Sequence, residues 1–200
     1  MSHHQQSAPS TRRQFLAQAG VTAAAASFIP RTILGAAPIV SASKKVNVAI
    51  IGAGGQGIVN AKHLFNLPDV QIVAVADVMR EADYSRFYYG GVAGRLPAKA
   101  LIEKHYGRPC ADYVDFREML DKEKSIDAVL VATPDHIHPI AMIESAKRGK
   151  HVYCEKPLSR SVYEVRAMAK AARDAGIATQ MGNQGHSGDG IRMTVEWIRD

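Results

Sequence analysis

The sequence predicts an α/β protein built on a doubly wound parallel sheet of about six strands. After residue 43, short β-branched apolar runs alternate with amphipathic segments that are long enough to hold crossover helices. This alternation is typical of a parallel sheet that helices cover on both faces. The predicted strands span residues 46–51, 71–76, 111–114, 127–132, 151–154 and 177–181.

Helix-boundary signals lie between these strands. They comprise two capping boxes, one proline suited to a first helical turn and two glycines suited to helix ends. These residues are Asp115 with Glu118, Ser161 with Glu164, Pro139, Gly149 and Gly176. Residues 81–97 hold four aromatic side chains and three glycines and follow neither a helix nor a strand period, so we predict a loop there.

Residues 1–43 differ from the rest of the chain, since they contain no acidic residue and are rich in Ala and Ser. Arg12 and Arg13 are followed by Phe15, Leu16 and an Ala-rich, mildly apolar stretch. This order is typical of a twin-arginine signal, and a disordered tail is the alternative. We therefore expect a leader that engages the twin-arginine export machinery and a periplasmic or otherwise exported protein. The sequence leaves the cleavage site open.

Composition and charge exclude several classes of partner. Arg12, Arg13 and Arg31 lie in the leader, and the remaining 22 basic residues face 19 acids. This small surplus gives no electrostatic reason to expect a nucleic-acid partner. Cys110 and Cys154 are too few for a disulfide framework or a zinc site, so we expect no metal. No apolar run approaches the roughly 20 residues of a membrane-spanning helix, so no membrane span is expected.

A glycine-rich turn follows the first predicted strand and precedes a predicted helix. Gly52 permits the tight turn, Gly54 lets the backbone approach a pyrophosphate, and Gly57 lets the helix pack close to the strand. The N–H groups at the helix N-terminus would face the phosphates. We therefore predict a Rossmann-type dinucleotide site in which Gly52, Gly54, Gly55, Gln56 and Gly57 bind the cofactor.

Asp77 follows the second predicted strand, 20 residues after Gly57. A carboxylate at this place accepts hydrogen bonds from the adenosine ribose hydroxyls and repels a 2′-phosphate. We predict that Asp77 binds the cofactor and that NAD is favoured over NADP. Arg80 weakens the preference, because a nearby guanidinium could accommodate the 2′-phosphate. The alternative for Asp77 is a helix N-cap or a loop aspartate.

Polar residues follow the fourth and fifth predicted strands, in the segments 133–138 (TPDHIH) and 154–157 (CEKP). Because doubly wound folds bind ligands at the carboxyl ends of their strands, we predict that chemistry takes place here. Lys156 could bind or protonate a substrate oxygen, and a solvated surface lysine is the alternative. His136 and His138 are equally well explained as capping or loop histidines.

Three segments carry a resemblance to the Gfo/Idh/MocA family of nicotinamide-dependent oxidoreductases. They are residues 49–57 (AIIGAGGQG), 132–138 (ATPDHIH) and 154–159 (CEKPLS), and the second and third together are far more specific than the first. The resemblance covers about residues 44–200. It implies a dinucleotide-binding Rossmann domain over residues 44–181, with the start of a second, substrate-binding domain over residues 182–200.

The resemblance also implies roles for the residues that match the family's motifs. Lys156 is implied to bind the cofactor on its nicotinamide side and to be the catalytic residue that orients the substrate and transfers a proton. Thr133, Pro134 and His138 are implied to line the cofactor cleft, and Glu155 to contact the nicotinamide ribose.

In the family, a second α+β domain carries a histidine general acid/base, most substrate contacts and the sheet on which the oligomeric state depends. The chain ends at Asp200 without that domain, so we expect it to be incomplete for catalysis and leave an oligomer of the full-length protein open. Asn183 and Gln184 lie in the segment that crosses toward that domain, which implies a place near the substrate.

The expected function is hydride-transfer oxidation of a carbohydrate or polyol hydroxyl. Because the periplasm lacks a comparable pool of free nicotinamide nucleotide, an exported enzyme would hold its NAD tightly through a complete cycle. Two alternatives stay open. One is an exported NAD-dependent glycosidase that uses transient oxidation and elimination. The other is a nucleotide-binding fragment without catalysis.

Overall fold

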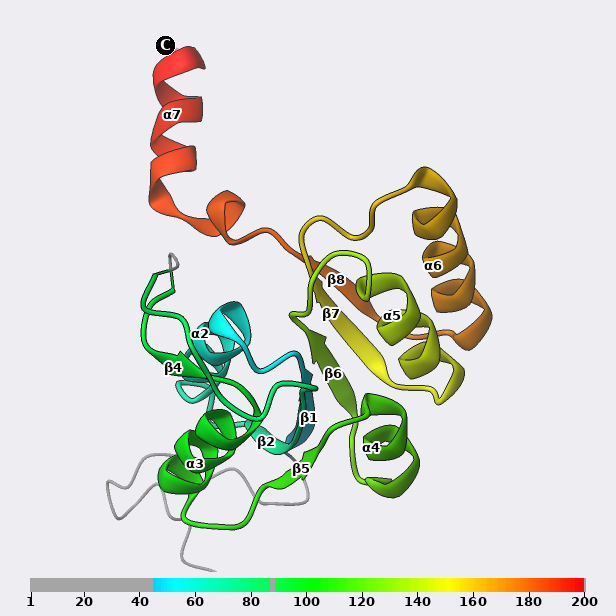
Figure 1. Ribbon diagram of the computed structural model, residues 1–200. Coiled ribbons are helices and arrows are strands. Elements are labelled where there is room, and N and C mark those ends of the chain that lie inside the picture. Colours follow the sequence, from blue (N-terminus) through cyan, green and yellow to red (C-terminus); the bar gives the residue numbers. More distant parts are fainter. Residues whose placement is uncertain (1–44, 87–88, 200) are drawn as a thin grey trace, which may run out of the picture. The chain divides into compact units, whose positions relative to one another are not determined.

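The computed structural model describes residues 45–86 and 89–199 and confirms the predicted fold class. Six parallel strands form one sheet in the order β5-β2-β1-β6-β7-β8 (Figure 1). Their bounds are β1 Val46–Ile51, β2 Val70–Ala76, β5 Ala111–Tyr113, β6 Ala128–Val131, β7 His151–Glu155 and β8 Thr179–Gly182. The leader and its twin-arginine motif lie outside the described residues.

The strand order reverses between β1 and β6. The chain runs outward from β1 to β2 and β5, and then returns to place β6 on the other side of β1. The crossovers on the two sides of this point therefore leave the carboxyl ends of β1 and β6 in opposite directions. In doubly wound sheets such a switch point opens a crevice for a ligand.

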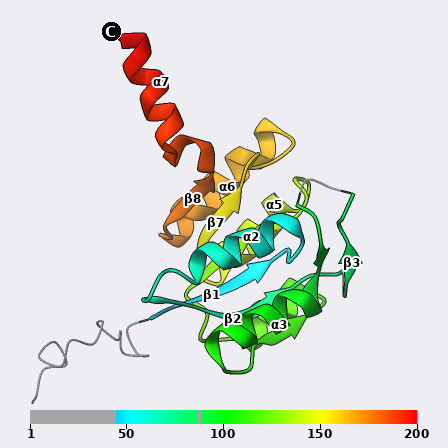
Figure 2. The ribbon, with the colours of Figure 1, turned by 90° about the vertical axis from the view of Figure 1, so that its left-hand side faces the viewer.

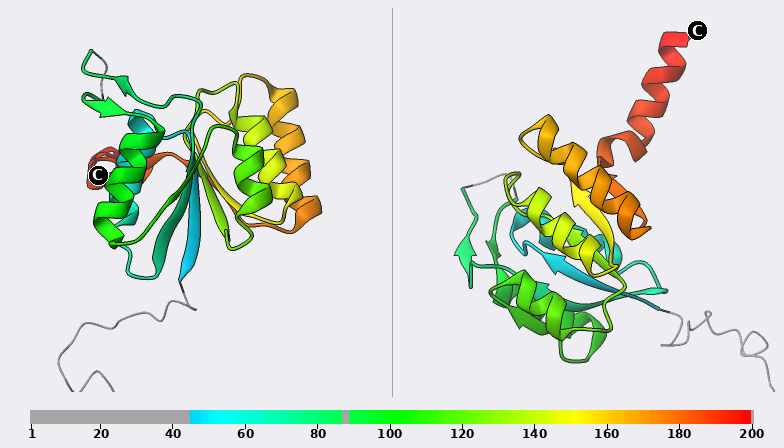
Figure 3. Two further views of the ribbon diagram at one scale, coloured as in Figure 1. Left: turned by 60° about the horizontal axis from the view of Figure 1, so that its bottom comes forward. Right: turned by 90° about the vertical axis from the view of Figure 1, so that its right-hand side faces the viewer.

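Helices cover both faces of the sheet. Helices α2 (Gly55–Leu64) and α3 (Arg95–Tyr106) lie on one face, in front of β1 and β2 in Figure 2. The opposite face carries α4 (Phe116–Lys122), α5 (His138–Lys147) and α6 (Val162–Ala175). The left panel of Figure 3 shows the sheet between these two layers. Right-handed crossovers on the two sides of the switch point account for this division.

The alternation of side chains along β1 builds two hydrophobic cores. Val48 and Ile50 pack in the cluster under α2 and α3, whereas Ala49 and Ile51 pack in the cluster under α4, α5 and α6. Because both faces of the strand are buried from Val48 onward, residues 48–51 form a continuous apolar run, whereas Asn47 lies at the less buried start of the strand.

The predicted helix-boundary signals are confirmed. The side chains of Asp115 and Ser161 accept hydrogen bonds from backbone N–H groups in the first turns of α4 and α6. Pro139 lies in the first turn of α5. Gly176 ends α6 with a φ of 64°, and Gly149 follows α5 with a φ of 70°, a left-handed conformation that favours glycine.

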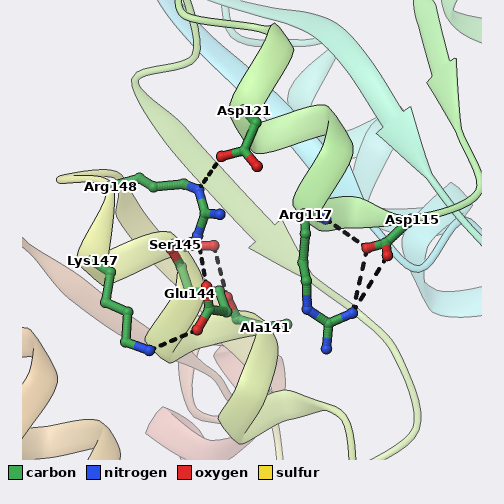
Figure 4. A network of polar contacts seen from close by, with 8 residues as sticks. All are labelled: Asp115, Arg117, Asp121, Ala141, Glu144, Ser145, Lys147 and Arg148. Carbon is green, nitrogen blue, oxygen red and sulfur yellow. Dashed lines mark hydrogen bonds and ion pairs between the residues drawn. The ribbon is translucent and has the colours of Figure 1, made fainter.

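A polar network joins α4 to α5 (Figure 4). Arg148 donates hydrogen bonds from Nε to Oδ1 of Asp121 at 2.8 Å and from Nη1 to Oε2 of Glu144 at 2.7 Å. Lys147 and then Arg148 hold the pKa of Glu144 below its usual value. The Asp121 carboxylate is exposed, so solvent screens the Arg148–Asp121 pair and it adds little to stability. The pair links α4 and α5, whose N-terminal residues both lie at the carboxyl ends of the sheet strands.

Residues 81–97 contain more structure than predicted. Strands β3 (Ala82–Asp83) and β4 (Val92–Ala93) pair antiparallel, and α3 begins at Arg95. The loop prediction was therefore wrong for these segments. The N-cap of α3 is Gly94, which has a φ of 120° and no side chain to cap the helix. The sequence consequently carried no capping signal at this boundary.

The bounds of β1 are as predicted, and those of the other strands of the main sheet differ from the predictions by at most two residues. The largest difference is at the start of β8, which is Thr179 rather than 177. After β8 come the 3-10 helix η3 (Gln184–Ser187) and α7 (Asp189–Arg199), in which no residue is buried. Within residues 45–86 and 89–199, no helix is both long and apolar enough to cross a membrane.

Candidate functional site

The carboxyl ends of β1, β2, β6 and β7 open onto a cleft of about 840 Å³. Most of the predicted cofactor residues line it together, although they come from four separate parts of the sequence. They are Gly52, Gly54, Gly55, Gln56, Asp77, Thr133, Pro134, His138, Glu155 and Lys156. Gly57, Asn183 and Gln184 are not among the lining residues.

The glycine turn leaves no room for side chains at two positions. Gly52 has a φ of 90°, and a Cβ there would lie 2.7 Å from the carbonyl carbon of Ala132 at the end of β6. A Cβ on Gly57 would lie 2.0 Å from the carbonyl oxygen of Gly52. Glycine at 57 therefore allows α2 to pack directly against the turn, as predicted.

The N-terminus of α2 lies at this turn and can receive an anion. Gly54 is its N-cap, no side chain caps the helix, and its first turn contains no acidic residue. Gly54, Gly55 and Gln56 all line the cleft. The N–H groups and the positive end of the helix dipole together form a site that fits a phosphate.

Asp77 is tied to the glycine turn through its carboxylate. Its Oδ2 accepts a hydrogen bond from the N–H of Ala53 at 2.7 Å, and its Oδ1 accepts one from the N–H of Met79 at 2.8 Å. Each carboxylate oxygen can accept a further hydrogen bond. The hydrogen bond from Met79, two residues further along, is typical of a loop aspartate. The alternative that Asp77 is a loop aspartate is therefore partly correct. Asp77 also lines the cleft, where its remaining acceptor capacity is available to a ligand.

Two tyrosines from the segment around β3 and β4 lie against the glycine turn. A Cβ on Gly54 would lie 3.3 Å from the hydroxyl of Tyr84, and a Cβ on Gly55 would lie 2.3 Å from the ring of Tyr89. Both tyrosines line the cleft. The segment is also attached to the turn by a 2.9 Å hydrogen bond from the N–H of Gly94 to the carbonyl oxygen of Ala53.

Thr133 presents an unsatisfied polar atom at the end of β6. Its hydroxyl oxygen is buried and has no hydrogen-bond partner among the described residues. Buried hydroxyl groups almost always have partners, so a bound ligand would satisfy this one. Thr133 thus supports the fit of the cleft to a polar ligand.

His138 connects the two strand-end segments. Its side chain is buried, with Nδ1 2.8 Å from the carbonyl oxygen of Pro157 and Nε2 2.8 Å from that of Thr133. Both ring nitrogens face backbone carbonyl oxygens, to which a ring N–H donates. This geometry favours the structural interpretation of His138 over a catalytic one, although the residue does line the cleft.

Lys156 is an exposed residue in the wall of the cleft, directly after β7. Its backbone N–H donates to the carbonyl oxygen of Gly182 at 3.2 Å. Within the described part of the chain, its ammonium group forms no ion pair. The ammonium group is therefore available to an oxygen of a ligand.

The carboxylate of Glu155 contacts a cluster of amides, of which Asn60 is buried, Gln56 half-buried and Gln184 exposed. Its Oε1 accepts hydrogen bonds from Nδ2 of Asn60 at 2.7 Å and from Nε2 of Gln184 at 2.6 Å. Gln56 in turn donates from Nε2 to Oδ1 of Asn60 at 2.8 Å. Gln184, which was expected near the substrate, thus contacts the Glu155 carboxylate, and it lines a second hollow of about 520 Å³ beside α2.

Sequence reasoning did not single out Asn60. Its only sequence signal is an amide at a helical position that faces the sheet, since Asn60 lies one turn after Gly57 and is 5% exposed. Asn183, next to Gln184, is exposed and is the N-cap of η3.

The charge of Glu155 affects its neighbours in β7. Burial and then Glu155 raise the pKa of the Cys154 thiol to about 12. The same two causes raise the pKa of Tyr153. No three metal-binding side chains (His, Cys, Asp or Glu) cluster in the part of the chain that the structure describes.

Similarity to known proteins extends over most of the described chain. The model of the Gfo/Idh/MocA oxidoreductase family, described as having an NAD-binding Rossmann fold, matches residues 46–183. The chain is 30% identical over 139 residues to scyllo-inositol 2-dehydrogenase (NAD(+)) from Bacillus subtilis. This alignment covers 69% of the chain and 35% of the relative. The chain is also 34% identical over 146 residues to a glycosyl hydrolase family 109 protein from Stenotrophomonas maltophilia. That alignment covers 72% of the chain and 29% of the relative.

Solved structures share the fold. Myo-inositol 2-dehydrogenase from Lactobacillus plantarum superposes with a TM-score of 0.63 at 26% identity, covering 78% of this chain and 41% of that one. Scyllo-inositol dehydrogenase from Lactobacillus casei, solved with NAD(H) and scyllo-inositol, gives a TM-score of 0.62 over the same shares at 19% identity. The chain spans about a third of the length of the curated relatives it matches.

Proposed function

The chain belongs to the Gfo/Idh/MocA oxidoreductase family, and from this premise we propose that the protein oxidises a sugar or polyol hydroxyl with NAD. One observation supports this most strongly. The glycine turn and the two polar strand-end segments, far apart in sequence, line a single cleft. The inositol dehydrogenases among the relatives indicate the substrate class.

Backbone groups would hold the cofactor at the β1 end of the cleft. The N–H groups at the start of α2 would bind the pyrophosphate, because no side chain caps them and the first turn of the helix contains no acidic residue. The buried hydroxyl of Thr133 would gain the hydrogen-bond partner that it lacks among the described residues. When bound, the cofactor supplies a nicotinamide ring that accepts and returns hydride.

Asp77 would accept hydrogen bonds from the adenosine ribose hydroxyls and thereby favour NAD over NADP. A 2′-phosphate would bring a second negative group toward a carboxylate that already lies at the glycine turn. Arg80, which could have offset that repulsion, is not among the residues that line the cleft.

Lys156 would be the catalytic residue. Its ammonium group lies in the wall of the cleft and is not held by an ion pair in the described part of the chain, so it can hydrogen-bond the reacting hydroxyl. The ammonium form can only donate, so Nζ would take up the hydroxyl proton as the neutral amine and later return it. His138 would act only by joining the segments that follow β6 and β7.

We further propose that the protein is exported by the twin-arginine route and carries its NAD with it. The support is the Arg12-Arg13 motif and its acid-free surroundings. An enzyme that works without a nucleotide pool would keep the cofactor through both halves of its cycle.

An NAD-dependent glycosidase is the second candidate, and the similarity to a glycosyl hydrolase family 109 protein favours it. Such an enzyme would release a free sugar with no net NADH, whereas an oxidoreductase would yield an oxidised product.

Native mass spectrometry of the protein from a periplasmic extract tests the proposal. We expect a mass that corresponds to the chain without its leader plus one NAD. An uncleaved chain would contradict the export proposal. A chain that neither carries nucleotide nor binds added NAD would contradict the oxidoreductase proposal and favour a non-catalytic role.

A further inference from the structure

Glu155 is a buried carboxylate without a cation. Its residue is 4% exposed, and in the described ranges it takes part in no ion pair. Buried carboxylates are normally paired with a cation or a metal. An unpaired one at the edge of a cleft therefore needs an explanation.

Neutral amides hold this carboxylate in place. Asn60 and Gln184 both donate to Oε1, and Gln56 fixes the orientation of the Asn60 amide by donating to its oxygen. The amides satisfy hydrogen bonds but add no positive charge. The negative charge of Glu155 is therefore held in one position without being neutralised.

The backbone is shaped to admit the carboxylate. A Cβ on Gly182 would lie 2.7 Å from Oε2 and 2.8 Å from Cδ of Glu155. Glycine at the end of β8 thus leaves the space that the carboxylate occupies. Four segments, α2, β7, β8 and η3, together surround this one side chain.

The nearest formal cation in the sequence does not neutralise the charge. Lys156 follows Glu155 directly but lies after the end of β7. Tyr153 and Glu155 face α2, whereas Cys154 packs in the core on the other face. Within the described part of the chain, the ammonium group of Lys156 forms no ion pair with Glu155.

Glu155 would lie at one end of a bound dinucleotide. The phosphates would bind at the glycine turn after β1, and Asp77 after β2 marks the adenosine side. Because β6 and β7 continue the sheet in the other direction, the nicotinamide half would extend toward Thr133 and Glu155. The nicotinamide ring carries a positive charge when oxidised and none when reduced.

Resting on the proposed function, we infer that Asn60 and Gln184 are positioning residues that hold the Glu155 carboxylate toward the nicotinamide end of the cleft, so that the site binds NAD⁺ more tightly than NADH. The carboxylate attracts the charged ring and has no such attraction for the neutral one. This preference would favour the oxidised cofactor as the resting state of an enzyme that retains it.

The test measures the dissociation constants of NAD⁺ and NADH by isothermal titration calorimetry on the nucleotide-free, full-length protein. We expect NAD⁺ to bind more tightly, and Glu155→Gln to reduce the ratio of the two constants about tenfold. Asn60→Leu and Gln184→Met, which each remove one amide donor, should reduce it by a smaller factor. Circular dichroism checks that each variant is folded.

Asp77→Asn is the matched control, because it removes a carboxylate at the adenosine end. It should weaken both nucleotides by the same factor and leave the ratio unchanged. A purely structural role for Glu155 would likewise change both affinities together. An unchanged ratio in Glu155→Gln, Asn60→Leu and Gln184→Met would therefore overturn the inference and leave the proposed function intact. Failure of the wild-type protein to bind either nucleotide would instead overturn the proposed function.

Discussion

The two ends of the cleft are built in different ways. At the β1 end, the glycine turn offers backbone groups, two of its glycines exclude any side chain, and the Asp77 carboxylate lies beside it. At the β7 end, the site consists of side chains, and Glu155 is held by residues 95 and 29 positions away in sequence. Substitutions of the glycines should therefore act through sterics. Substitutions of Asp77 and of the side chains at the β7 end should act through charge and hydrogen bonding.

The largest expected effect is at the β7 end. We expect Lys156→Ala in the full-length protein to abolish turnover while NAD stays bound, since the ammonium group is proposed to act on the substrate. Turnover and bound nucleotide are measured on the same preparation. Lys170→Ala is the control, because Lys170 pairs only with Asp174 on the exposed side of α6. Wild-type turnover in Lys156→Ala would remove Lys156 from the catalytic role.

At the β1 end, Gly57→Ala should act through sterics alone. Its new Cβ would lie 2.0 Å from the carbonyl oxygen of Gly52, so α2 must move away from the turn. We expect a loss of roughly 1–3 kcal/mol in the free energy of unfolding, together with loss of NAD binding. Denaturant titration and calorimetry measure the two effects. Gly190→Ala, where a Cβ meets no atom within 4 Å, should leave NAD binding unchanged and, because Gly190 lies in α7, should not lower the free energy of unfolding. A Gly57→Ala protein that bound NAD like wild type would show that the contact is unimportant.

A smaller effect at the same end is expected for Asp77→Ala. Loss of the carboxylate should weaken NAD binding about tenfold, because the ribose hydroxyls lose their acceptor. The same change should relax discrimination against NADP, which competition binding of the two nucleotides measures. Asp174→Ala on α6 is the control. Unchanged affinity for both nucleotides would mean that Asp77 serves only the backbone of Ala53 and Met79.

The smallest effect lies outside the cleft and concerns stability. Hydrogen bonds from Lys99, and then from Arg95, hold the pKa of Asp112 below its usual value despite partial burial. A carboxyl group with a lowered folded-state pKa stabilises the fold above its unfolded-state pKa, and the contribution is lost as the pH falls through the folded-state value. Asp112→Asn should therefore cost about 1 kcal/mol at pH 7 and almost nothing near pH 2. Chemical denaturation at both pH values checks this, and an equal cost at both would contradict it.

Local sequence was sufficient for the fold class and for the glycine turn. Alternating apolar runs predicted all six strands to within two residues, because buried parallel strands must be apolar on both faces. Capping residues marked α4 and α6, because a cap is a contact between residues two or three positions apart. Where a glycine took the place of a capping side chain, at Gly94, the start of α3 was missed.

The roles of the other site residues depended on contacts between distant segments. The sequence by itself determined that a strand, a glycine turn, a helix and two polar strand ends would lie at one edge of a sheet. Only the tertiary structure decided that His138 joins Thr133 to Pro157 and that Asn60 and Gln184 meet on Glu155. The physical reason is that sheet order and helix packing, rather than sequence neighbours, bring these hydrogen-bonding groups within 3 Å of one another.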